Sequence, residues 1–164
     1  MSHGRPPRRP RRVSLNPIAL AKNSATRLTQ AEISGAITPM RAATRALREG
    51  VATEWEWSVV VSAVNVAQAI DKQGVVRGLA EHLHSAELAL QGIHQRAMAS
   101  GTWCATALYY QELDHIATAV DLHGFQMQQL SYSEFRHAVL RAAAEIRAAG
   151  GRVVDVGQLE GAFA

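Results

Sequence analysis

The chain has 164 residues, of which 48% are hydrophobic and 5% aromatic, and its formal net charge is +3. This length supports one ordinary core rather than two, and the scarcity of aromatic residues beside abundant alanine favours packed helices over a sheet. The single cysteine, Cys104, excludes an internal disulfide and a cysteine-based zinc site, so we expect a reducing cytoplasm, and no apolar stretch approaches the roughly 20 residues that cross a membrane.

The first 16 residues are rich in arginine and proline and offer almost nothing to bury, so we expect a disordered arm over residues 1–16. Its positive charges, with no acid among them, are Arg5, Arg8, Arg9, Arg11 and Arg12. Removing these five charges turns the net charge of +3 into −2, so the basicity belongs to the arm. Such guanidinium groups neutralise phosphates, which makes these arginines candidate contacts to DNA or RNA without sequence preference. A solubilising tail and an organellar transit peptide are the alternatives, and the prolines of the arm oppose the helix that a transit peptide forms.

We expect a helical domain over residues 17–151. Asn16-Pro17 predicts a turn, followed by a single helical turn over residues 18–21. Residues 29–32, Thr-Gln-Ala-Glu, have the spacing of a capping box, which predicts a helix from Gln30. Pro39 is expected to break this helix, with Thr38 capping a second one over residues 39–49.

A second capping box, residues 53–56, opens the segment 54–72. Its valines favour a strand by propensity, but its length without a turn signal before Gly74 favours a central helix. From Val75 to Ala97 apolar residues recur every three or four positions, which predicts a further helix that stops at Gly101.

The next helix is expected to begin after a cap at Thr102 and to end at Gly124. Its inward stripe consists of Tyr109, Leu113, Ile116 and Val120. A third capping box, residues 131–134, predicts a last helix over residues 132–149, followed by a tail over 152–164. Connections of two to eight residues favour an all-α, up-and-down bundle of about five helices.

Two Glu-x-x-His pairs, Glu81/His84 and Glu112/His115, have the spacing that ferritin-like di-metal bundles use. Such a site would add glutamates from further helices, for which Glu56 and Glu134 are candidates. Helical geometry turns both pairs away from the apolar stripes, so we expect solvated surface residues and predict neither a metal nor another cofactor.

The remaining nucleophiles and bases show no catalytic arrangement, and we predict no catalytic residue. His82, His94, His123 and His137 form no triad pattern with Cys104 or a serine, and we expect these polar side chains to lie outside the core. Cys104, beside Trp103, is expected to be a buried residue at the start of an apolar helix rather than a nucleophile.

The three tryptophans, Trp55, Trp57 and Trp103, are candidate interface residues. Trp55 and Trp57 lie roughly 160° apart around a helix, so both cannot face one core and one of them should be exposed. Exposed tryptophan is enriched where proteins bind, so we expect a protein partner or a homo-oligomer.

The segment from residue 37 to residue 149, about two-thirds of the chain, resembles small helical proteins of unassigned function from proteobacterial prophages and mobile elements. The resemblance rests on the basic start leading to Val13-Ser14-Leu15-Asn16-Pro17, on Val64-Asn65-Val66 followed by Ala69-Ile70, on Leu122-His123, and on the last capping box before Phe135. It implies a role in replication control, regulation or countering host defence, and it assigns no active residue.

Three functions follow as hypotheses. The leading one is a non-enzymatic interaction or regulatory protein, encoded by a phage or mobile element, that acts through contacts of its bundle. The alternatives are a nucleic-acid-binding accessory protein that uses the arm and a ferritin-like di-metal protein.

Overall fold

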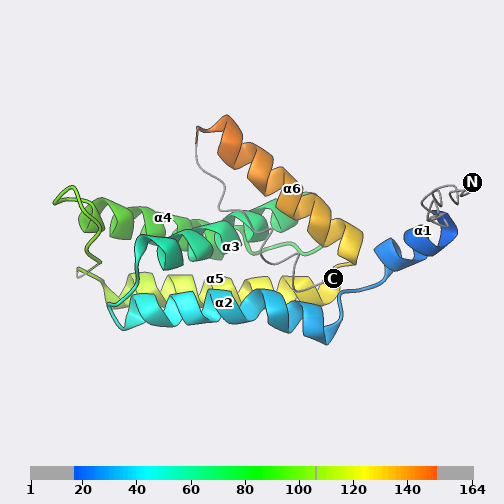
Figure 1. Ribbon diagram of the computed structural model, residues 1–164, viewed down its shortest axis with the longest axis horizontal. Helices are drawn as coiled ribbons and strands as arrows, with labels where there is room; N and C mark the ends of the chain where they lie inside the picture. Colours follow the sequence, from blue (N-terminus) through cyan, green and yellow to red (C-terminus); the bar gives the residue numbers. More distant parts are fainter. Residues whose placement is uncertain (1–16, 106, 151–164) are drawn as a thin grey trace, which may run out of the picture.

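The computed structural model describes residues 17–105 and 107–150 (Figure 1). These residues form six helices and no strand: α1 (Pro17–Ala25), α2 (Gln30–Arg48), α3 (Glu54–Gln73), α4 (Ala80–Ala97), α5 (Tyr110–Gln129) and α6 (Tyr132–Ala148). The predicted all-α class is confirmed. The arm with its five arginines, and the tail over residues 152–164, lie outside the described residues.

Helices α2 to α5 form a bundle in which consecutive helices run in opposite directions (Figure 1). Helix α3 packs on α2, α4 on α3, α5 on α4, and α5 closes the ring by packing on α2. Each helix contributes side chains that are completely or almost completely buried, among them Leu47, Val60, Leu83, Ile93, Ile116 and Val120. The apolar stripes predicted for α4 and α5 contribute to this core from Leu83 and Leu113 onward, whereas Val75 and Tyr109, at their starts, are exposed.

Helix α6 lies across the bundle at an angle and packs on α3 (Figure 1). A second, smaller core joins the two helices and consists of Val66, Ala69, Ile70, Leu130, Ala138 and Ala142. Alanine side chains allow the helix axes to approach closely. Helix α1 extends beyond the end of the bundle and contacts α6.

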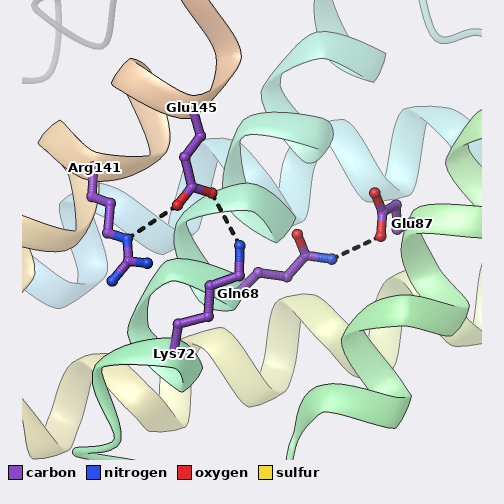
Figure 2. Close-up of polar contacts among 5 residues, drawn as sticks. All are labelled: Gln68, Lys72, Glu87, Arg141 and Glu145. Atoms are coloured by element: carbon purple, nitrogen blue, oxygen red, sulfur yellow. Dashed lines mark hydrogen bonds and ion pairs between the residues drawn. The ribbon is translucent and has the colours of Figure 1, made fainter. Parts of the chain in front are cut away.

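Polar contacts at the edge of this smaller core join three helices (Figure 2). Glu145 of α6 accepts hydrogen bonds from Lys72 of α3 and from Arg141, each at 3.0 Å. These bonds, that of Lys72 first, lower the pKa of Glu145. Gln68 of α3 donates to Glu87 of α4 at 3.0 Å. Only the bond between Lys72 and Glu145 joins α6 to the bundle, and because all five side chains are partly solvated these contacts contribute little to stability.

The three predicted capping boxes are all present. Thr29, Thr53 and Ser131 are the N-caps of α2, α3 and α6, and in each box the glutamate three residues later accepts from the amide of the cap. The hydrogen bonds from Thr53 and Ser131 lower the pKa of Glu56 and Glu134 respectively. Local side-chain chemistry therefore sets where these three helices begin.

The predicted break at Pro39 is wrong, because α2 continues through it to Arg48. Proline has no amide hydrogen, so the carbonyl of Gly35 loses its usual partner, but Gly35 lies on the exposed side where water can reach it. Ile37 and Met40, on either side of Pro39, are buried in the same core. The free energy gained by continuous packing on one face of α2 thus exceeds the cost of the hydrogen bond missing at Pro39.

Other predicted helix ends also differ from the structure. Helix α1 runs to Ala25, beyond the single turn predicted, and α4 begins at Ala80 rather than at Val75. Helix α5 begins at Tyr110, not after Thr102, so residues 98–109 form a connection longer than the expected two to eight residues. The helix also continues through Gly124, which is buried against Ile37 of α2. Tertiary contact makes a glycine acceptable there despite its low helix propensity.

No helix within the described ranges combines the length and the apolar character needed to cross a membrane.

Candidate interaction surface at the aromatic end of the bundle

The bundle gathers most of the aromatic side chains at the end where α2 and α4 finish and α3 and α5 begin. We call this the aromatic end, and its rings are Trp55, Trp57, Trp103, Tyr109 and Tyr110. They comprise all three tryptophans and two of the three tyrosines of the chain. Because neighbouring helices are antiparallel, the turn between α2 and α3 lies at the same end of the bundle as the start of α5 (Figure 1).

Trp55 and Trp57 differ in burial as their angular separation predicts. Trp55 is 58% exposed. Trp57 is half-buried, and its indole Nε1–H donates to the carbonyl of Leu90 in α4 at 3.0 Å. Trp57 therefore stabilises the contact between α3 and α4, while Trp55 is available to solvent.

Three tilted rings, those of Trp57, His94 and Trp103, form a cluster at the aromatic end. Their centroids lie 4.6 Å apart for Trp57 and His94, 5.9 Å for the two tryptophans and 6.2 Å for His94 and Trp103. The Nε1–H of Trp103 donates to the carbonyl of Ala52 at 2.8 Å. This bond joins the connection after α4 to the turn between α2 and α3.

Two arginines hold the tyrosines. Arg96 lies 4.5 Å from the ring centroid of Tyr109 and forms an ion pair with Glu112. Arg48 lies 5.9 Å from the centroid of Tyr110 and pairs with Asp114 at 2.6 Å. Cation–π contacts of this kind orient the rings while leaving their outer faces exposed.

Several large apolar side chains are therefore exposed at this end of the bundle. Val51, Tyr109 and Tyr110 are 67%, 59% and 73% exposed, comparable to Trp55. Rigid aromatic side chains lose little conformational entropy on binding, so they are effective contact residues.

The two Glu-x-x-His pairs do not converge. Glu81 and His84 are exposed on α4, and His115 is exposed on α5. Glu112 is held by Arg96. Among the described residues, no three His, Cys, Asp or Glu side chains come together closely enough to hold a metal ion. Glu56 and Glu134, the suggested additional ligands, cap α3 and α6.

The expectation that the histidines lie outside is wrong for His123, which is completely buried together with Gln126. Its position continues the inward stripe of α5, after Ile116 and Val120 and before the buried Met127. That periodicity is readable in the sequence, because His123 lies within the helix predicted to end at Gly124, three residues after Val120. Burial lowers the pKa of His123 to about 4, against a weaker opposing effect of its hydrogen bond with Gln126.

The expected burial of Cys104 is also wrong. The residue is exposed, because it lies in the connection between α4 and α5 and not at the start of a helix.

Comparison with known proteins yields no relative: no family model, no curated protein and no solved structure matches this chain. The resemblance to prophage-encoded helical proteins therefore stays a prediction.

Proposed function

We propose that this chain is a non-enzymatic interaction protein that binds a protein partner, or a second copy of itself, through the aromatic end. The observation that carries the proposal is the exposure of Trp55, Tyr109 and Tyr110 at one end of the bundle. A cytoplasmic location and an origin in a phage or mobile element belong to the same proposal. The exposed thiol of Cys104 suits a reducing compartment.

Energetics favour the tryptophan as the anchor of such a contact. Interface residues that contribute most to binding are enriched in tryptophan, tyrosine and arginine, and they are supported by well-packed neighbours. Trp55 is exposed near the start of α3, and Val51, in the turn before the helix, is exposed as well. Trp57 and Trp103 are half-buried and donate hydrogen bonds inside the domain, so their role in the surface is support.

Substituting Trp55 by Ala tests the proposal. Truncating an anchoring tryptophan costs about 2 kcal/mol or more, so partner binding or self-association should weaken at least tenfold, as measured by sedimentation velocity and by capture from host lysate. Leu140→Ala is the matched control, since Leu140 is also 58% exposed but lies on α6. The melting temperature should stay nearly unchanged in both variants.

Equal binding by the Trp55→Ala protein and the wild type would exclude the aromatic end as the contact surface. Substituting Trp57 would not be informative, because losing its packing and its bond to Leu90 destabilises the domain itself.

A second candidate function, sequence-independent binding of nucleic acid, is favoured by the charges on α6. Arg136 and Arg147 are exposed, and within the described part of the chain neither forms an ion pair. Helix α1, to which the arm is attached, contacts α6. The five arginines of the arm and these two side chains would together follow a phosphate backbone.

Deleting residues 1–12 should then abolish binding to a random DNA duplex in a fluorescence anisotropy titration. The slope of log affinity against log salt should flatten by roughly 4 to 5 for the five arginines lost. Arg136→Ala should flatten the slope by only about 1. Binding that survives the deletion with its salt dependence intact would rule out the arm as its source.

A further inference from the structure

Two features of the chain have complementary chemistry: the arginine- and proline-rich residues 5–12, and the exposed carboxylates of Glu49 and Glu54 on either side of the turn that precedes Trp55. We infer that residues 5–12 of one copy bind the aromatic end of a second copy, so that the chains associate head to tail. This inference rests on the proposed function of the aromatic end and names its occupant.

The segment 5–12 reads Arg-Pro-Pro-Arg-Arg-Pro-Arg-Arg. Proline-rich segments bind exposed aromatic rings in the polyproline II conformation, because proline restricts the backbone and lowers the entropy lost on binding. Arginine guanidinium groups stack on aromatic faces and form bidentate bonds with carboxylates. The segment therefore requires a surface that offers both aromatic rings and unpaired acids.

The turn between α2 and α3 offers both. Trp55 and Val51 are exposed there, and so are the carboxylates of Glu49 and Glu54. Neither carboxylate forms an ion pair with any residue that the structure describes. Cationic groups thus have acids available beside the tryptophan.

The basic residues of the same end do not cancel this negative charge. Arg48 and Arg96 are already engaged by Asp114 and Glu112. Arg45 is exposed in the last turn of α2 and supplies one positive charge against Glu49 and Glu54. The surface around Trp55 is therefore acidic, whereas the arm carries five positive charges and no acid.

Distance favours a second copy over the same chain. The arm joins α1 at Pro17, and α1 lies beyond the end of the bundle opposite to the aromatic end (Figure 1). The 19 residues of α2 alone span about 28 Å between these ends. Arg9 lies eight residues before Pro17, which is about 25 Å in polyproline II. The centre of the arm therefore falls short of its own aromatic end.

Such a contact is heterologous, since each copy provides one arm and one aromatic end. Two variants of the full chain each disable one side of this contact. The arm variant replaces Arg5, Arg8, Arg9, Arg11 and Arg12 by Ser. The second variant alters the aromatic end and carries Trp55→Ala with Glu54→Gln. Glu54 and Trp55 are both exposed, so the second variant should fold like the wild type. Circular dichroism melting verifies the folding of both variants.

Sedimentation velocity of nuclease-treated protein at low salt gives the test. Wild-type protein should associate, and each variant alone should associate at least tenfold more weakly. An equimolar mixture of the two variants should form a dimer and nothing larger, because only one intact arm and one intact aromatic end remain to pair. Raising the salt concentration should dissociate that dimer.

A mixture that remains monomeric, or a wild-type chain that does not associate, would overturn the inference. So would undiminished association of the variant whose five arm arginines are replaced by serine. If the arm variant still associates but the Trp55→Ala variant does not, the proposed function holds, and the aromatic ends of two copies bind one another. Association that persists in the Trp55→Ala variant would contradict the proposed function as well.

Discussion

His123 is the residue whose burial has the largest expected effect on how the stability of the fold depends on pH. Its Nδ1 lies 3.4 Å from the side-chain oxygen of Gln126, whose amide donates to the carbonyl of Ala67 in α3 at 3.1 Å. Its Nε2 is buried and has no hydrogen-bond partner among the described residues. A charge on this ring would have to be carried without water, so the folded protein favours the neutral imidazole.

Acidification should therefore destabilise the fold between pH 6.5 and about 4. The unfolded chain binds a proton near pH 6.5, whereas the folded chain resists protonation until about pH 4. Stability is complete above pH 6.5 and is lost as the pH falls toward 4, by about 3 kcal/mol in total. Urea unfolding at several pH values measures the change.

The variant His123→Gln isolates this effect. It should show a nearly flat free energy of unfolding from pH 6.5 to pH 5. Glu56, Glu134 and Glu145 have lowered pKa values in the folded protein, so each stabilises the fold when ionised. This stability is lost only as the pH falls through the ordinary glutamate pKa, near 4.5. An unchanged slope between pH 6.5 and 5 in the variant would show that another group is responsible.

At the scale of the helix, the surroundings of a glycine decide whether replacing it by alanine stabilises the fold. Gly35 in α2 has open space where a Cβ would lie. Gly92 in α4 faces the pair Arg96–Glu112, and an added Cβ would lie 3.1 Å from a terminal nitrogen of Arg96 and from a carboxylate oxygen of Glu112. Arg96 is also held by the carbonyl of Ala107 at 2.9 Å, so it has little freedom to move.

The two glycines should consequently respond to alanine in opposite directions. Gly35→Ala should raise the free energy of unfolding by about 0.5–1 kcal/mol through helix propensity. Gly92→Ala should lower it by about 1 kcal/mol, because the methyl group displaces the ion pair that holds Tyr109 and the connection 98–109. Chemical denaturation of the two variants side by side provides the comparison, and an equal gain at both positions would refute the role assigned to Gly92.

At the scale of the whole molecule, stability is unevenly distributed. Helices α2 to α5 each bury several side chains in the main core. Helix α6 buries only Ala138 and Ala142, and α1 packs on α6. The free energy of local opening increases with the apolar surface that an element buries.

Amide hydrogen exchange should reveal this order. Amides of α1 and α6 should exchange through openings that cost less than global unfolding, whereas the central turns of α3 and α5 should exchange only with the whole domain. Mass spectrometry of peptic fragments measures the difference. Equal protection of α6 and α3 would mean that the two cores unfold together.

Part of the candidate site was predictable. The angular separation of Trp55 and Trp57 indicates that one ring must leave the core, and this exposure is observed. The support by His94, the contact of Trp103 with Ala52 and the stacking of Arg96 on Tyr109 had no sequence signal, because each joins segments far apart in the chain.

The sequence by itself determined the helical class, the starts of α2, α3 and α6 and the inward stripes, because capping boxes and apolar spacing act over a few neighbouring residues. Only the tertiary structure decided that α2 passes through Pro39 and that α5 passes through Gly124. These features depend on burial against other helices, whose free energy exceeds local propensity. Antiparallel packing also decided that three tryptophans meet at one end of the bundle.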